Sequence, residues 1–546
     1  MLEQTNSQMR LQASESAHWI PTAEVPRTTV GSQLRRAASL VPDRVALVDG
    51  CGRLDEDRDD GSIARRWTYA ELLELTERLA SHLLEELEPG DRIAIWAPNS
   101  AEWLHLDLAA ALAGLVVVPV NALYRLVEAE YVLRATLPAI VVHGESHRDI
   151  DIGAAARSLS AQLPCVRRTL GLDELIAEAR SMIAEPRMLP SVECEHTAQI
   201  QFTSGTTGAP KGVLLHHRGL TSMPAVAVEL MDLGDAPVWL NVMPLHHIGG
   251  CGLSTMGPIA ALGTQVLADR FTAGGALRLI EQERVTVMGS VPTMLLAMLD
   301  HPDRAIRDLS SMRVVISGGA TVSPELVRTI EQTFGVRFVV AFGQTESHGH
   351  IAQTRPDDSD VDKAETVGRP LPHVEVKLVH LVSGNLLLFG QPGEVCTRSP
   401  LVMGGYLDDP VATDAAIDAD GWLHTGDVCS MDDRGYMTVV GRTKDMIVRG
   451  GENISPREIE ERLATHPSVA EVAVIGVPDA RLGESIAAFV RCRDGLQPTR
   501  AELSDWTAAA LAAYKVPAHW RFVEALPLTA NGKVRKPVLR EMWAGS

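Results

Sequence analysis

Short β-branched runs alternate with helical patterns from about Pro26 onward, and this alternation constrains the fold more than any other feature of the 546-residue chain. Strands spaced in this way, with helices between them, form parallel sheets wrapped by helices, so the predicted fold class is α/β. Helices are expected at 68–86 and 324–334. The expected strands are 92–97, 115–120, 139–143, 285–288, 313–317 and 336–342.

A second unit is predicted to begin near Lys444, where glycines bracket a charged run. Ser455, Pro456 and Glu458 then supply an N-cap serine, an N1 proline and the returning glutamate of a capping box. Strands at 470–477 and 486–493 and a helix at 501–513 indicate a compact α+β unit. We therefore predict three parts: a polar N-terminal tail (1–25), a large domain with several subdomains (26–443) and a small C-terminal domain (444–546).

Composition narrows the class of partner. Hydrophobic residues at 45% and charged residues at 22% are typical of a globular protein. A net charge of −20 argues against nucleic acid or an anionic membrane surface as partner, since both require a basic face. The seven scattered cysteines, the polar start of the chain and the absence of an apolar run of roughly 20 residues favour a cytoplasmic protein with reduced thiols and no integral membrane association.

The strongest chemical signal is a segment rich in glycine and hydroxyl groups that follows an apolar run. Its glycines let backbone amides approach a phosphate, its hydroxyls donate hydrogen bonds and its lysine adds a point charge. The segment lacks the Gly-Lys-Ser/Thr ending of a Walker loop and the Gly-x-Gly-x-x-Gly dinucleotide pattern. It predicts a polyphosphate site, and it reads Thr203-Ser204-Gly205-Thr206-Thr207-Gly208-Ala209-Pro210-Lys211-Gly212.

With this segment the chain resembles the adenylate-forming superfamily of acyl-CoA synthetases, luciferases and adenylation domains, and most closely the acyl-CoA ligases. The resemblance extends from about Gln33 to Lys536. It implies an AMP-forming acid–thiol ligase that uses ATP, Mg²⁺ and coenzyme A, and a small C-terminal domain that moves about a hinge at Lys444.

A second motif, Ala341-Phe342-Gly343-Gln344-Thr345-Glu346, ends a predicted strand. The resemblance implies that the Phe342 ring flanks adenine beside Gly343, where family members usually have tyrosine. It further implies that Thr345 contacts phosphate and that Glu346 holds Mg²⁺, which suits a cation that prefers oxygen ligands.

Two further motifs complete the nucleotide site that the resemblance implies. Asp427, in His424-Thr425-Gly426-Asp427, is expected on the ribose hydroxyls, and Arg442 near the ribose and phosphate. Lys533, in Asn531-Gly532-Lys533, is expected to neutralise charge where the carboxylate attacks the α-phosphate.

The acyl and thiol sites are also predicted. The resemblance makes His247 the residue that gates the acyl pocket between the two steps, and assigns Arg449, Gly450 and Gly451 to the pantetheine tunnel. The predicted acyl lining is His247, Gly249, Gly250, Ser317, Gly318, Gly319 and Ala341.

The acid is predicted to be a fatty, aryl or polycyclic acid without an amino group. An α-ammonium group in a pocket of low dielectric constant needs a carboxylate partner, and residues 241–264 contain neither Asp nor Glu. Four alternatives stay open at this stage: a carrier protein as the acyl acceptor, a luciferase-like oxygenase, a member that retains one half-reaction, and assembly as a homodimer.

Overall fold

The structure, a computed structural model, describes residues 16–544 except 22, 51–63, 182–187, 204–209, 321, 450–451, 480 and 529–533. The chain divides into two compact units, which are described separately. The first comprises Ile20–Glu375 and Thr397–Leu423, and the second comprises the strand ending at Trp19, Val376–Cys396 and His424–Ser546. Lys444 lies inside the second unit, so the domain boundary and hinge there stay predictions.

The first unit contains a nine-stranded sheet whose central strands are parallel and whose edge strands are antiparallel. Parallel neighbours direct their carboxyl ends to the same edge of the sheet, where ligands usually bind. In spatial order the strands are β16 (Arg369–Pro370), β15 (Ala352–Gln353), β14 (Arg337–Phe342), β13 (Val314–Gly318), β12 (Val287–Ser290), β10 (Val238–Asn241), β11 (Thr264–Leu267), β2 (Val45–Asp49) and β3 (Arg66–Thr68).

The described part of this unit also contains a six-stranded sheet. All its neighbours are parallel except the last pair, which forms an antiparallel hairpin. Its order is β7 (Arg168–Gly171), β6 (Ile140–His143), β4 (Arg92–Trp96), β5 (Val116–Val120), β8 (Thr197–Thr203) and β9 (Lys211–His216). The predicted parallel sheets, and the six strands expected from the β-branched runs, are confirmed.

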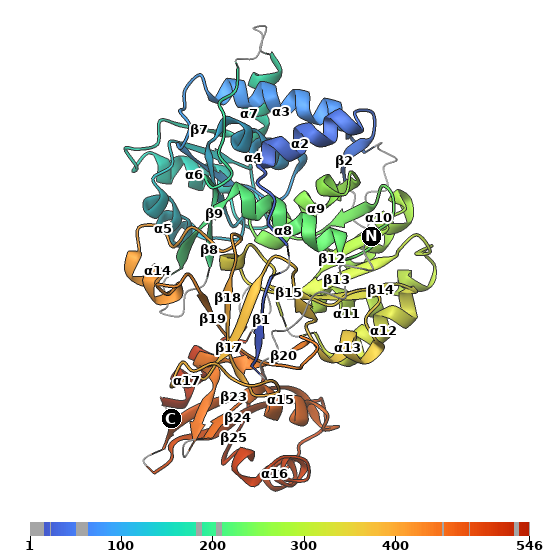
Figure 1. Cartoon of the computed structure of the whole chain (residues 1–546), viewed down its shortest axis with the longest axis vertical. Coiled ribbons are helices and arrows are strands. Elements are labelled where there is room, and N and C mark those ends of the chain that lie inside the picture. Colours follow the sequence, from blue (N-terminus) through green and yellow to red (C-terminus); the bar gives the residue numbers. More distant parts are fainter. Residues whose placement is uncertain are drawn as a thin grey trace. The chain divides into compact units, whose positions relative to one another are not determined.

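Helices cover both sheets, and one layer of helices is shared between them (Figure 1). Along β4, Ile93 and Ile95 face the shared core while Ala94 and Trp96 face a separate core on the other side of the sheet. This period of two is that of a strand buried on both faces. The helices are α2 (Val30–Leu40), α3 (Tyr69–Leu83), α4 (Ala101–Ala113), α5 (Leu126–Thr136), α6 (Ile152–Ser160), α7 (Leu172–Ser181), α8 (His217–Glu229), α9 (Ser254–Ala260), α10 (Ala273–Glu283), α11 (Pro292–Asp300), α12 (Pro324–Phe334), α13 (Asp360–Glu365) and α14 (Pro410–Ala416).

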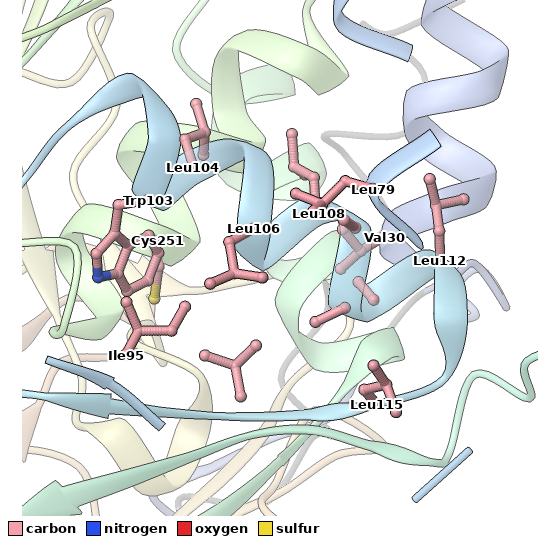
Figure 2. Close-up of a cluster of buried hydrophobic side chains, with 14 of the residues drawn as sticks. Val30, Leu79, Ile95, Trp103, Leu104, Leu106, Leu108, Leu112, Leu115 and Cys251 are labelled. Carbon is pink, nitrogen blue, oxygen red and sulfur yellow. The ribbon is translucent and has the colours of Figure 1, made fainter. Parts of the chain in front are cut away.

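Helix α4 lies in the shared core and is buried along its entire length. Ser100 caps its start by accepting a hydrogen bond from the backbone N–H of Trp103, at 3.1 Å. Gly114 ends it in the left-handed conformation at φ 71°, which glycine adopts without a steric cost. Figure 2 shows Trp103 and Leu106 of α4 near Cys251. A helix that is apolar on almost every side requires packing partners on every side, and the two sheets with their helices supply them.

A chain of buried polar groups crosses this apolar layer. Gln199 Nε2 donates to Asp107 Oδ1 at 2.7 Å, and Gln201 Nε2 donates to Gln199 Oε1 at 2.8 Å. Cys251 Sγ donates to Gln199 Oε1 at 3.3 Å, and its pKa is raised by burial. Burial also raises the pKa of the Asp107 carboxyl to about 7. These contacts fix α4 against β8, whose carboxyl end begins the predicted phosphate segment.

The described residues of the second unit form two sheets and three helices. The first sheet has the order β1 (His18–Trp19), β17 (Glu375–Val379), β18 (Gly393–Arg398), β19 (Leu423–Met431) and β20 (Met437–Arg442). The second has the order β22 (Glu452–Ile454), β21 (Ile447–Arg449), β24 (Gly483–Cys492) and β23 (Val469–Asp479), with β25 (His519–Phe522) parallel to β24. The helices are α15 (Pro456–Ala464), α16 (Arg500–Ala508) and α17 (Lys536–Ala544).

The predicted capping box at the start of α15 is wrong in its hydrogen bonds, although Ser455 is the N-cap residue and a proline opens the helix. The Ser455 hydroxyl donates instead to the carbonyl oxygen of Val440 on β20. Glu458 accepts from Lys515 Nζ, at 2.7 and 2.6 Å for its two oxygens. Both side chains hydrogen-bond to residues distant in sequence instead of to the start of the helix. A local sequence pattern cannot predict such long-range partners.

Asp107 allows a test of how the polar chain affects folding. Its pKa is 3.8 when exposed and about 7 when folded, so the folded state binds the proton more tightly. The resulting stabilisation is complete below the unfolded pKa and is lost as pH rises through about 7. The parent therefore loses stability between pH 5 and pH 8, whereas an asparagine at this position does not titrate. We expect the free energy of unfolding of Asp107→Asn, minus that of the parent, to be about 3 kcal/mol larger at pH 8 than at pH 5.

Denaturant midpoints measured by tryptophan fluorescence at both pH values check this expectation. The matched control is Asp232→Asn, which makes the same change at a side chain with 85% exposure in the same unit. If the difference between Asp107→Asn and the parent is the same at both pH values, Asp107 does not titrate as described.

Candidate functional site

The predicted phosphate segment joins two paired strands at the carboxyl end of β8. Thr203, the last residue of β8, lies opposite Lys211, the first residue of β9, in an antiparallel register. Tyr131 Oη donates to the carbonyl oxygen of Pro210 at 2.8 Å. Ser204, Gly205, Thr206, Thr207, Gly208 and Ala209 lie outside the described residues. The described residues therefore fix both ends of the segment at one edge of the six-stranded sheet.

The second motif lies at the carboxyl end of β14, as predicted. Phe342 is the last residue of the strand and is buried, and Thr345 and Glu346 lie in the short 3-10 turn η3 (Thr345–Ser347). A side chain on Gly343 would place its Cβ 2.5 Å from the carbonyl oxygen of Gly349. Glycine at position 343 thus lets the chain fold back closely after the strand and present Glu346 at its end.

Tyr406 contacts both motifs and is not among the residues predicted from the sequence. Its hydroxyl donates to Glu346 Oε1 at 2.9 Å, and Lys211 Nζ lies 4.8 Å from the centre of its ring. Burial, together with the neighbouring carboxylate, raises the pKa of the Tyr406 hydroxyl, which keeps it a hydrogen-bond donor. The start of β9, which follows the predicted phosphate segment, and the turn of Glu346 are thus connected through one aromatic side chain.

Backbone pairing with β9 holds Tyr406 in this place. Leu407 N donates to the carbonyl oxygen of Gly212 at 2.7 Å, and Leu214 N donates to that of Gly405 at 3.0 Å. Gly405 has φ 127°, and a Cβ on it would lie 3.1 Å from Thr413 Cγ2. The sequence signal that was available is the glycine pair directly before the tyrosine, which is typical of a backbone packed closely against its neighbours.

Two buried histidines hold the backbone just before Tyr406, at Leu401 and Val402. His216 accepts from the backbone N–H of Gly219 through Nδ1, at 3.0 Å, and its Nε2 donates to the carbonyl oxygen of Val402 at 2.9 Å. His348 Nδ1 donates to the carbonyl oxygen of Leu401 at 2.7 Å. Burial lowers the pKa of both imidazoles, that of His348 to about 3. Both rings are therefore neutral and act as hydrogen-bonding spacers.

The predicted acyl residues come from three strand ends of the nine-stranded sheet. Gly318 on β13 lies opposite Ala341 on the adjacent parallel strand β14, so these two are brought together. Ser317 and Gly319 flank Gly318 in sequence, and the Ser317 side chain is buried. A Cβ on Gly318 would lie 2.4 Å from the carbonyl oxygen of Ala341, so this glycine also permits the close strand packing.

The predicted acyl residues at the third strand end follow β10 and include a pair of histidines. Its rings, those of His246 and His247, have centres 5.0 Å apart. Burial and the neighbouring histidines lower the pKa of His246 to about 3. The segment enters a π-helix, η1 (Gly249–Leu253), in which a Cβ on Gly250 would lie 2.1 Å from the carbonyl oxygen of Pro244. Gly250 is therefore required by the backbone turn itself, whereas Gly249 has its nearest neighbour, Met243 Cε, at 3.4 Å.

In the second unit, Asp427 and Arg442 lie opposite each other on β19 and β20. Arg442 Nε is 2.8 Å from Asp427 Oδ1, with the aspartate buried and the arginine half exposed. Thr425 Oγ1 donates to the carbonyl oxygen of Val395 at 2.8 Å and accepts from Asp427 N at 3.1 Å. The structure thus brings the predicted acceptor and donor together as one ion pair.

The remaining predicted residues also belong to the second unit. Lys444 lies in the exposed turn η4 (Thr443–Asp445), and the Arg449 guanidinium donates to the carbonyl oxygen of Tyr514. Gly450, Gly451 and Lys533 lie outside the described residues. Leu528 and Val534, which flank the segment of Lys533, form an antiparallel bridge.

Comparison with known protein families gives two matches. The model described as AMP-binding enzyme matches residues 34–407. The model described as AMP-binding enzyme C-terminal domain matches residues 458–533. Together they take in the motifs of the first unit and most of the C-terminal α+β part.

Similar proteins cover nearly the full chain. The chain is 38% identical over 529 residues to the 3-[(3aS,4S,7aS)-7a-methyl-1,5-dioxo-octahydro-1H-inden-4-yl]propanoyl:CoA ligase of Mycobacterium tuberculosis, covering 94% of this chain and 99% of the relative. It is 36% identical over 546 residues to the mitochondrial medium-chain acyl-CoA ligase ACSF2 of Homo sapiens, covering 94% and 87%. Among solved structures, ATP-bound MatB from Rhodopseudomonas palustris is similar with a TM-score of 0.82 and 29% identity, covering 94% of this chain and 99% of that one.

Proposed function

The chain belongs to the AMP-binding enzyme family and is an ATP-dependent acyl-CoA ligase, and on this premise we propose how its residues share the reaction and which acid it takes. A carboxylate is a poor electrophile at neutral pH. The ligase therefore adenylates it, with release of pyrophosphate, and the thiol of coenzyme A then displaces AMP. The work of the protein in both steps is to position the reactants and stabilise charge.

We assign the triphosphate to the segment between Thr203 and Lys211. Backbone amides and hydroxyls there donate hydrogen bonds, and Lys211 supplies a positive charge. The support is the location of both ends of the segment at the carboxyl end of a strand in a largely parallel sheet. Tyr406 holds Lys211 near Glu346, so the cation and the carboxylate act on the same group of phosphates.

Glu346 and Thr345 fit the Mg²⁺ that accompanies ATP. The Tyr406 hydroxyl donates to Oε1 of Glu346 and leaves lone pairs on both oxygens for a cation that takes oxygen ligands. When bound, Mg²⁺ neutralises phosphate charge as pyrophosphate departs. The part played by Tyr406 is to fix the rotamer of Glu346, since a carboxylate held by a hydrogen bond needs no reordering when the cation arrives.

We assign the ribose hydroxyls to Asp427, with Arg442 beside the ribose and phosphate and the Phe342 ring beside adenine. The Asp427 carboxylate is already oriented by Arg442, and the backbone N–H of Asp427 donates to the Thr425 hydroxyl, so the acceptor assigned to the ribose hydroxyls is held in place. Lys533 is assigned to the attack of the carboxylate on the α-phosphate. Arg449, Gly450 and Gly451 are assigned to the pantetheine arm, and Lys444 to the hinge between the two steps.

We propose an apolar acid with a single carboxylate and no amino group. Residues 241–264 provide no acidic partner for an ammonium group. Burial keeps His246 neutral, so this histidine provides no cationic partner for a second carboxylate. The named activities of the relatives, on a bicyclic propanoate and on medium-chain acids, support the same class. His247 and the residues at the ends of β13 and β14 are assigned to the acyl group.

A panel of acids tests the substrate class. We expect thioester formation with bicyclic propanoates and medium-chain acids, and at least about tenfold lower kcat/KM with amino acids and dicarboxylates of the same length, because each buried uncompensated charge costs several kcal/mol. The measurement is mass spectrometry of acyl-CoA with ATP and Mg²⁺. A phosphopantetheinylated carrier protein in place of coenzyme A tests the alternative acceptor, and preference for a dicarboxylate would contradict the proposal.

Tyr406→Phe tests the support of Glu346. The substitution keeps the ring under Lys211 and removes the hydrogen bond to the carboxylate, which is worth about 1.5–3 kcal/mol when one partner is charged. We expect the Mg²⁺ concentration for half-maximal acid-dependent ATP–pyrophosphate exchange to rise about tenfold. Tyr124→Phe, at a half-buried tyrosine of the same unit, is the control and is expected to match the parent. An unchanged Mg²⁺ requirement in Tyr406→Phe argues that the tyrosine does not orient Glu346.

Lys533→Ala tests the assignment of the first half-reaction. Removing a charge that acts on the α-phosphate is expected to lower ATP–pyrophosphate exchange by about 100-fold or more. Thioester formation from preformed acyl-adenylate is expected to change by less than about threefold, because the thiol then attacks the acyl carbon, the acyl C–O bond breaks and no bond to phosphorus is made or broken. Lys536→Ala, which removes the same charge three residues away, is the control and is expected to keep exchange near the parent rate. Exchange in Lys533→Ala equal to that of the parent would show that the role is wrong.

A further inference from the structure

Three side chains with different ligand atoms meet on one face of the five-stranded sheet in the second unit. Glu394 and Cys396 are two residues apart on β18 and therefore point to the same face of the strand. His424 lies on the neighbouring strand β19. His424 Nδ1 is 3.0 Å from Glu394 Oε2 and 3.4 Å from Cys396 Sγ. The three ligand atoms all lie within 4.8 Å of one another.

These separations suit a tetrahedral metal ion. Zinc binds oxygen, nitrogen and sulfur ligands at about 2.0–2.3 Å, so ligand atoms around one ion lie roughly 3.3–3.8 Å apart. A small adjustment of side-chain rotamers brings the three atoms into that range. One oxygen, one imidazole nitrogen and one thiolate form a mixed set that favours Zn²⁺ over Mg²⁺ or Ca²⁺, which take oxygen ligands.

Burial is graded across the three residues in a way that allows an ion to enter. Cys396 is fully buried, whereas the Glu394 side chain is 17% exposed and that of His424 is 34% exposed. An ion can therefore approach from the side of the imidazole and the carboxylate and take the thiolate last. The solvent side leaves space for a water molecule as the fourth ligand, as in zinc sites with three protein ligands.

The carboxylate is already oriented for this role by the backbone. Glu394 Oε1 accepts from the N–H of Gly426 at 3.1 Å, while its other oxygen, Oε2, faces His424. One oxygen is thus anchored and the other is presented to the ligand cluster, which is the division of roles seen in carboxylates that bind metals. A hydrogen bond between Glu394 and His424 requires no thiol, so Cys396 is the residue that distinguishes a metal site from a simple polar pair.

We propose that Glu394, Cys396 and His424 form a binding site for Zn²⁺ that is separate from the Mg²⁺ of the ATP site. On binding, the thiol of Cys396 gives its proton to solvent and the thiolate takes the ion. The imidazole binds through Nδ1 as the tautomer that carries its proton on Nε2, so one proton is released per ion. The occupied site joins β18 to β19 and stabilises the sheet that carries Asp427.

Titration of the full-length, reduced, chelator-treated chain with Co²⁺ as a spectroscopic probe tests this site. We expect one Co²⁺ per chain, with a thiolate-to-cobalt absorption band and the intense visible bands of a tetrahedral ion. Zn²⁺ should displace the Co²⁺, and millimolar Mg²⁺ should not. Calorimetry in buffers of different ionisation enthalpy is expected to give one proton released per Zn²⁺.

Substitutions test whether Cys396 and His424 are the ligands that produce the cobalt absorption bands. Cys396→Ser is expected to abolish the thiolate band and weaken Zn²⁺ binding at least about 100-fold, the loss of one ligand exceeding the 10–100-fold loss typical of outer-shell changes. Cys429→Ser, at a fully buried cysteine of β19, is the matched control and is expected to keep the band and the affinity of the parent. If Cys396→Ser does not fold, as judged by circular dichroism, His424→Ala is used in its place and must lose the tetrahedral visible bands. Absence of a thiolate band in the parent, or its persistence in Cys396→Ser, overturns the proposal.

Discussion

Burial of helix α4 on all sides is the constraint on which the first unit depends. A helix whose residues are all buried cannot lie at a surface, so it requires packed elements on every side of it. The shared layer of α2, α3, α4, α8 and α9 satisfies this requirement for both sheets at once. Its position in turn fixes β8 through the Asp107–Gln199–Gln201 contacts, and the predicted phosphate segment begins at the carboxyl end of β8.

Much of this fold could be predicted from the sequence, because the determining signals are local and periodic. The six β-branched runs correspond to strands, and the expected helix 324–334 coincides with α12, which Ser323 caps and Gly335 ends. Features that depend on which of several possible partners a side chain binds could not be predicted. Ser455 has the sequence of a capping box, yet the carbonyl of Val440 takes its hydroxyl, and α16 ends at Ala508 although a helix was expected through residue 513. Among the described residues, no helix has both the length and the apolar character needed to cross a membrane.

The candidate site shows the same contrast, between residues that lie in sequence motifs and residues that hold those motifs in place. Thr203, Lys211, Thr345 and Glu346 lie in contiguous motifs, so they could be identified from their residue types and spacing. Tyr406 could not, since it lies 60 residues from Glu346 and is brought to it by long-range backbone hydrogen bonds, those of its segment with β9 and the one that Met403 N donates to the carbonyl oxygen of Glu346. The roles of His216 and His348 could not be predicted either, because these histidines are neutral only through their burial in the folded chain.

The charge of the chain explains why such support matters. At a net charge of −20 the protein as a whole repels a polyphosphate, so binding depends on a few cations placed at short range. Lys211 is held over the Tyr406 ring and Arg442 against the Asp427 carboxylate, and each is therefore oriented before a ligand arrives. A cation fixed in this way loses little side-chain entropy on binding, whereas a mobile lysine on an acidic surface loses most of it. His216 and His348 add no positive charge to this arrangement, because burial lowers the pKa of both imidazoles.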